Sequence, residues 1–153
     1  MRGVKMKLST RGRYGLRAML DIALEEKAGP VAAHTIAKRQ KISKKYLEQL
    51  LTTLKKAGLI KSVRGPQGGY VLGFNASEIT AGDIIRALEG PIAPVDCISE
   101  INPDHCNRAQ FCVTRQIWTR LRDSASQILD SYTLEDLLES FAACRNSAPT
   151  RNL

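Results

Sequence analysis

The stretch ISKKYLEQLLTTLKKAGLIKSVRGPQGGYVLG, residues 42–73, predicts a basic helix, a turn and a glycine-rich β-hairpin. Ser43 can cap the helix because its hydroxyl can accept from N–H groups that the first turn leaves unpaired. Leucines at helical spacing give the helix one apolar face: Leu47, Leu50, Leu51 and Leu54. Gly58 can end the helix in the left-handed conformation. The apolar runs at 59–63 and 70–72 then predict the two strands.

Three further helices are expected around this stretch. Ser9 or Thr10 can cap a first helix that runs to about Lys27, where a Gly-Pro pair follows. A second, short helix is expected at 33–40 and a fourth at 81–89. This order is that of a winged helix-turn-helix. The expected fold is therefore mainly α with a small β-hairpin wing, followed by a long C-terminal helix.

The positive charge is concentrated in the first half of the chain. Of the formal net charge of +8, residues 1–75 contribute +12, from 16 Lys and Arg against 4 Asp and Glu, whereas residues 76–153 contribute −4, from 7 against 11. Such a surplus of positive charge can simply reflect a solvent-exposed face, but here it coincides with the helix-turn-helix pattern. Because phosphates attract clustered Lys and Arg, the pattern favours double-stranded operator DNA as a partner. Without an apolar run of about 18 residues or a signal peptide, a cytoplasmic protein with no membrane partner is expected.

The dimensions of B-DNA suggest which side chains meet it. An α-helix fits the major groove, so the early residues of the basic helix should face phosphates and base edges, whereas a wing arginine suits the minor groove. The candidate DNA-contacting residues are Arg11, Arg13, Ser43, Lys44, Tyr46, Glu48, Gln49, Arg64 and Gly68. Glu48 has two readings. It can accept from cytosine N4 and act against wrong sites, or form a helix salt bridge with Lys44 or Lys45.

Three cysteines lie in one segment, and their closeness in the sequence indicates a shared function. Cys97, Cys106 and Cys112 are separated by eight and five residues, and the only other cysteine, Cys144, is not expected to join them. A disulfide framework does not suit a reducing cytoplasm. Thiolates on a loop can instead wrap a soft metal centre. Free or redox-sensing thiols, and a zinc site completed by His105, are the alternatives.

A long apolar stripe after the cysteines predicts a homodimer. In a helix expected from about Asn107 to Ser131 or beyond, the stripe contains Val113, Ile117, Leu121, Ala125, Ile128 and Tyr132. A small domain does not need so long a stripe, so it should pack against its twin and present two recognition helices to a palindromic site; packing on its own winged domain is the alternative. The expected units are a winged domain at 6–90, a cysteine loop at 91–108, a dimerisation helix and short terminal helix at 109–142, and a disordered tail at 143–153.

Taken together, these motifs make the chain resemble the IscR-like bacterial regulators, winged-helix repressors and activators of the Rrf-two superfamily. The strings that carry the resemblance are KLSTRGRYGLRAMLDIAL at 7–24, ISKKYLEQLL at 42–51, VRGPQGGYVLG at 63–73 and CVTRQIW at 112–118. The resemblance implies a transcription regulator, not an enzyme, that binds DNA as a homodimer through Ser43, Tyr46, Glu48, Gln49 and Arg64. It also implies an iron-sulfur cluster, 2Fe-2S or 4Fe-4S, on Cys97, Cys106 and Cys112.

The chain departs from that family at the fourth cluster ligand. Arg115 stands where members most like the cluster-assembly regulator have a His, residues 7–17 hold no carboxylate that a partner could lend, and the first cysteine gap is longer than usual. Local candidates for the fourth ligand are Asp96, Glu100, Asp104 and His105. Cluster type stays open, as do two rival functions: a cluster-free or zinc-binding regulator of cysteine metabolism, and an electron-transfer iron-sulfur protein, which would have no use for a wing.

Overall fold

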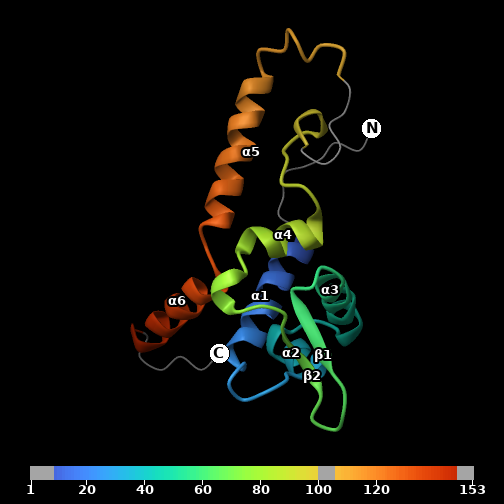
Figure 1. The fold of residues 1–153 in the computed structure, drawn as a ribbon, viewed down its shortest axis with the longest axis vertical. Coiled ribbons are helices and arrows are strands. Elements are labelled where there is room, and N and C mark those ends of the chain that lie inside the picture. Colours follow the sequence, from blue (N-terminus) through green and yellow to red (C-terminus); the bar gives the residue numbers. More distant parts are fainter. Residues whose placement is uncertain (1–8, 100–105, 148–153) are drawn as a thin grey trace.

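The computed structural model describes residues 9–99 and 106–147 (Figure 1). Its helices are α1 (Thr10–Leu24), α2 (Ala33–Gln40), α3 (Lys44–Lys56), α4 (Ala81–Glu89), α5 (Arg115–Asp130) and α6 (Leu134–Ser147). Its strands are β1 (Ile60–Val63) and β2 (Gly69–Leu72), and short 3-10 turns lie at η1 (Ala76–Glu78) and η2 (Asp96–Ile98). The predicted fold class, mainly α with a small antiparallel hairpin, is confirmed. No helix within the described ranges is long and apolar enough to cross a membrane.

The winged domain is built around the apolar face of α3. All four leucines of the predicted stripe are buried, and they pack with Met19 and Ile22 of α1 and with Ile36 of α2. Ser43 caps α3 as predicted, its hydroxyl accepting from the Tyr46 N–H at 3.2 Å. Burial of this face leaves the opposite face of α3 in solvent.

The wing is an antiparallel hairpin in which Ile60 pairs with Leu72 and Val63 with Gly69. Val31, between α1 and α2, bridges to Tyr70 in both directions, with N–O distances of 3.0 and 2.9 Å. This bridge adds a third short segment to the hairpin and fixes the wing to the helical part of the domain.

After α5 the chain returns to the winged domain. The Leu134 N–H donates to Ile79 O at 2.9 Å, and the Ala81 N–H donates to Tyr132 O at 2.8 Å. Leu134 is fully buried in the common core. In Figure 1, α5 stands away from the winged domain while α6 lies beside α1.

Three predicted boundaries were wrong. α1 ends at Leu24, not Lys27, because Glu25 and Glu26 donate to carbonyls only three residues back, which tightens and closes the helix. α5 begins at Arg115, not near Asn107, because residues 106–111 form turns with the same three-residue spacing. α6 continues to Ser147, so residues 143–147 of the expected tail are helical; 148–153 lie outside the described residues.

Candidate DNA interface and cysteine segment

The exposed face of α3, together with its N-cap, carries four of the nine predicted DNA-contacting residues. Ser43, Lys44, Glu48 and Gln49 are all exposed on the N-terminal half of the helix. Lys44 Nζ lies 3.5 Å from Glu48 Oε1, with both side chains at least half exposed. The salt-bridge reading of Glu48 therefore has a geometric basis, but such exposed pairs are worth about 1 kcal/mol at most. Glu48 can therefore leave Lys44 for another hydrogen-bond partner at a small cost in free energy.

Tyr46 differs from its neighbours because its ring helps to hold α3 on α1. It is half-buried, and its ring meets that of Tyr14 edge-on, with centroids 6.3 Å apart. The Arg17 guanidinium lies 5.5 Å from the centre of the Tyr14 ring. The sequence pattern placed Tyr46 only toward DNA and did not reveal this packing role.

The N-terminal turn of α1 brings more positive charge beside α3. Arg11 Nη2 donates to Thr53 Oγ1 at 2.9 Å, and Thr53 donates in turn to the carbonyl of Gln49 at 3.1 Å. Arg13 is exposed on the same helix. Two basic residues predicted from the first helix thus lie on an element that is bonded directly to the recognition helix.

The wing presents Arg64 at its tip, fully outside the core. Gly65 has a φ of 120°, and a Cβ on Gly68 would lie 2.3 Å from Val63 O. Gly68 is therefore required by the close approach of the hairpin to itself, whatever it does toward DNA. Lys55 Nζ donates to Ser62 Oγ at 2.7 Å and ties the wing to α3.

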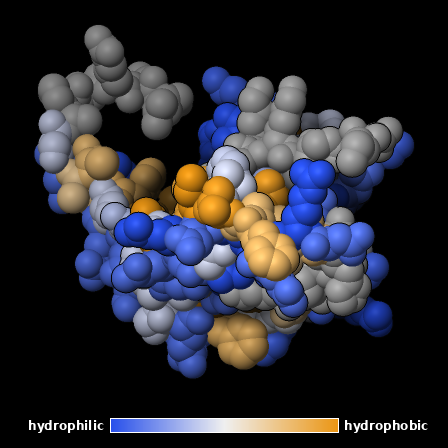
Figure 2. All heavy atoms as spheres, turned by 90° about the horizontal axis from the view of Figure 1, so that it is seen from above, coloured by the Kyte–Doolittle hydropathy of each residue, from blue (hydrophilic) through white to orange (hydrophobic). Residues whose placement is uncertain are grey.

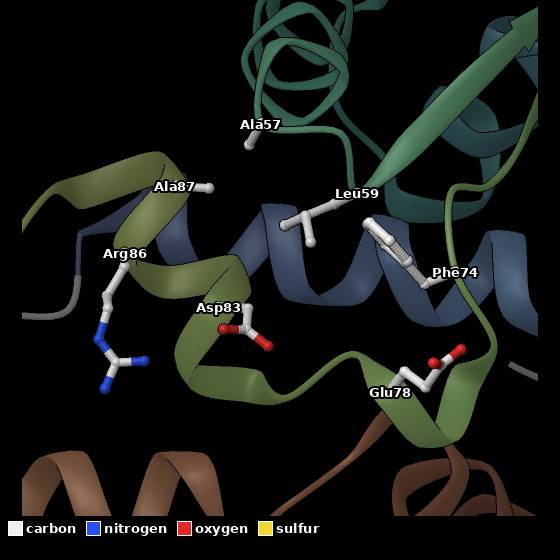
Figure 3. Close-up of a pocket in the computed structure, with 7 residues that line it drawn as sticks. All are labelled: Ala57, Leu59, Phe74, Glu78, Asp83, Arg86 and Ala87. Atoms are coloured by element: carbon white, nitrogen blue, oxygen red, sulfur yellow. The ribbon is translucent and has the colours of Figure 1, made fainter.

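A surface groove of about 600 Å³ lies between the end of α3 and α4 (Figure 3). Its polar groups already serve the fold. Glu78 accepts from the Asn75 N–H at 3.0 Å, and Asp83 accepts from the Thr80 N–H at 2.9 Å. Arg86 makes two 2.7 Å bonds to Asp130 of α5. Each polar side chain of this groove thus already has a structural partner.

The cysteine segment is anchored at one end by α5. Cys97 is half-buried on η2, whose Ile98 is 3% exposed and accepts at its carbonyl from Arg122 Nη1 at 2.8 Å. Cys112 lies just before α5, with its sulfur 3.2 Å from Thr114 Oγ1. That hydrogen bond, helped by the backbone N–H of Arg115, lowers the pKa of the Cys112 thiol.

The predicted metal ligands are not gathered in this structure. Among residues 9–99 and 106–147, no three His, Cys, Asp or Glu side chains form a group that could hold a metal ion. Cys106 is exposed, and Asp96 is exposed on η2. Glu100, Asp104 and His105 lie outside the described residues. The donor chemistry of three accessible thiols fits a soft metal centre, but the segment must rearrange before Cys97, Cys106 and Cys112 can share one.

Comparison with known proteins agrees with the fold and the wing. The family described as "Rrf2: Iron-dependent Transcriptional regulator" matches residues 8–140. The transcriptional regulator CymR of Bacillus subtilis is 48% identical over 132 residues, which cover 86% of this chain and 89% of CymR. The regulator IscR of Pectobacterium atrosepticum is 42% identical over 135 residues, 88% of this chain and 80% of IscR.

Solved structures give the same result. The structure of CymR, the global cysteine regulator of B. subtilis, superposes with a TM-score of 0.73 at 47% identity, over 88% of this chain and 98% of that one. IscR of T. potens superposes with a TM-score of 0.76 at 41% identity, over 95% and 94%. The resemblance inferred from the wing and recognition-helix strings is thus confirmed. This chain belongs to the Rrf2 family of winged-helix transcriptional regulators.

Proposed function

We propose that this Rrf2-family regulator binds operator DNA as a homodimer and changes its DNA affinity with the chemical state of the cysteine segment. The observation that carries the proposal is the exposed polar face of α3, with Arg11 bonded to its side and Arg64 beyond it on the wing. Ser43, Lys44, Glu48 and Gln49 then enter the major groove, and Arg64 follows the adjacent minor groove. Tyr46 contributes its hydroxyl edge while its ring holds α3 in place.

The dimer is supported by the exposed apolar face of α5. No residue of α5 is buried, and Ile117 and Ile128 are 59% and 60% exposed. This exposure supports the dimer over the alternative that the sequence left open, in which the stripe packs on its own winged domain. Figure 2, which views the molecule from the end where α5 begins, shows apolar side chains gathered on that end of the molecule. Apolar faces of this extent usually mark protein interfaces, and the helical repeat of this one suits a second copy of α5.

Two chemistries of the cysteine segment are candidates. An iron-sulfur cluster on Cys97, Cys106 and Cys112 agrees with the iron-dependent description of the family. When bound, it would supply redox and ligand-exchange chemistry with iron, nitric oxide or oxygen. A cluster-free thiol sensor is favoured by the separation of the three thiols, the lowered pKa of Cys112, and a relative named as a cysteine regulator.

Metal analysis of protein purified without oxygen tests the first candidate against the second. A cluster predicts visible absorption with iron and acid-labile sulfide, lost when Cys97, Cys106 and Cys112 are changed to Ser. Cys144→Ser is the matched control, because Cys144 is an exposed thiol on α6, outside the segment. Colourless protein without iron would leave the thiol sensor, and stoichiometric zinc would indicate a structural site. Operator affinity that is equal before and after modification of the segment would refute sensing by either route.

A further inference from the structure

The last residue of α4 caps the first turn of α1. Glu89 Oε1 accepts from the Ser9 N–H at 3.0 Å, from the Gly12 N–H at 2.9 Å and from the Ser9 hydroxyl. α1 has no acidic residue in its own first turn. A carboxylate there satisfies N–H groups that the helix leaves unpaired and is favoured by the helix dipole. Glu89, at the end of α4, thus supplies the acidic group that the first turn of α1 lacks.

The contact depends on two glycines of α1. A Cβ on Gly12 would lie 2.6 Å from Glu89 Oε1, and a Cβ on Gly15 would lie 1.9 Å from Leu88 Cδ1. The end of α4 therefore fits α1 only because both side chains are absent. A displacement of the end of α4 must therefore change the contacts at the start of α1.

The turn that Glu89 caps also carries the link to the recognition helix. Arg11 lies within it and donates to Thr53 Oγ1, one turn along α3 from Gln49. On the other side, Glu89 is followed by Gly90, with a φ of 86°, where the chain turns into the segment that holds Cys97. Arg86, one turn before Glu89, is bonded to Asp130 of α5. The last turn of α4 thus joins the cysteine segment, α5 and the DNA-binding face.

We infer that Glu89 is a positioning residue that transmits the state of the cysteine segment to the recognition helix. The inference rests on the proposed function. A rearrangement of the segment that pulls on Gly90 withdraws the carboxylate, leaves the donors of Ser9 and Gly12 unpaired, and loosens the turn from which Arg11 holds α3. Operator affinity then falls without any change in the residues that meet the DNA.

The test measures operator affinity before and after alkylation of the segment with N-ethylmaleimide. Cys144→Ser serves as the parent protein, so that only the segment thiols react, and the operator is selected from random duplex DNA. Alkylation should change the Kd of the parent by about fivefold or more, the usual range for coupled sites. In the Glu89→Ala protein the ratio of the Kd after alkylation to the Kd before it should fall to about one. Glu89→Gln, which keeps the accepting oxygen, should restore most of this ratio.

Two further variants keep the result interpretable. Gly12→Ala displaces the same carboxylate from the side of α1 and should also abolish the ratio, which covers the case in which Glu89→Ala does not fold. Glu78→Ala is the matched control, since Glu78 caps η1 in the same way, and within the described residues both of its side-chain hydrogen bonds are to Asn75. A ratio unchanged in Glu89→Ala and Gly12→Ala would overturn the inference and leave the proposed function standing. A ratio of one in the parent would reject both.

Discussion

Arg64→Ala should weaken operator binding through the loss of one nucleic-acid contact while leaving the fold intact. Within the described residues Arg64 is exposed at the wing tip and makes no ion pair, so its removal leaves no buried partner unsatisfied. The plot of log Kobs against log salt has a negative slope, and one lost phosphate contact should make that slope less steep by about 0.9. We expect affinity to fall by about tenfold, or about 1.4 kcal/mol, since the side chain also loses the attraction of the minor groove.

Arg39→Ala is the matched control, because it removes the same charge from an arginine that serves the fold. Arg39 Nη1 lies 2.6 Å from Asp21 Oδ1, and Asp21 is only 5% exposed; Nη2 lies 2.9 Å from Glu25. Without Arg39, the one side-chain bond that Asp21 keeps within residues 9–99 and 106–147 is the 3.2 Å bond from Gln40. Leaving a buried acceptor under-satisfied costs about 1–3 kcal/mol. That lowers the Tm by about 2–4 °C per kcal/mol in a protein of this size.

Fluorescence anisotropy across a series of salt concentrations, with thermal unfolding of the same proteins, separates the two effects. Arg64→Ala should change the salt slope and keep the Tm, whereas Arg39→Ala should lower the Tm and keep the slope. An Arg64→Ala protein with an unaltered slope and affinity would refute the placement of the wing against DNA. An equal loss of slope in both variants would show that only total charge matters, not the site.

Three more predictions concern other parts of the molecule. Glu48→Ala should relax base preference more than it weakens binding, as read from selection on random duplexes; an equal loss on all sequences would leave Glu48 only its salt bridge. Ile117→Glu should give a monomer in sedimentation velocity, whereas Gln116→Glu, a polar exposed neighbour, should not; a monomeric parent would reject the dimer. Arg86 lowers the pKa of Asp130, so their bond stabilises the protein above the unfolded-state pKa of a carboxyl, about 3.9, and this contribution is lost as pH falls through the lower folded pKa. Asp130→Asn should therefore lower the Tm relative to the parent protein at neutral pH, and this difference should shrink as the pH falls through the folded pKa of Asp130. A difference in Tm that stays constant with pH would contradict this.

The recognition helix and wing were predictable because every local signal in them agrees. The cap at Ser43, the leucine stripe and Gly58 specify α3 from adjacent residues alone, and the structure has α3 from Lys44 to Lys56. The start of α5 was not predictable in the same way. The apolar stripe begins before the helix does, and Thr114 at its N-cap makes no side-chain cap bond that sequence could signal.

Contacts between distant segments were the part that sequence reasoning missed. Glu89 and Ser9 are 80 positions apart, and Arg86 and Asp130 are 44 apart. No periodicity or capping motif joins such residues, because their pairing depends on how α4 packs on α1 and α5. Tyr46 illustrates the same limit, since its edge-on contact with Tyr14 became visible only once the two helices were placed together.

The return of the chain into the core through Leu134 has a consequence for which promoters this protein can use. α5 is fixed at its C-terminal end to its own winged domain, by Asp130 on one side and by buried Leu134 just beyond. If two subunits pair along α5 as proposed, the distance and angle between their winged domains are fixed. Because one added base pair turns a half-site by about 34–36° around the duplex, the spacing between half-sites should limit the set of genomic targets as strictly as their base sequence.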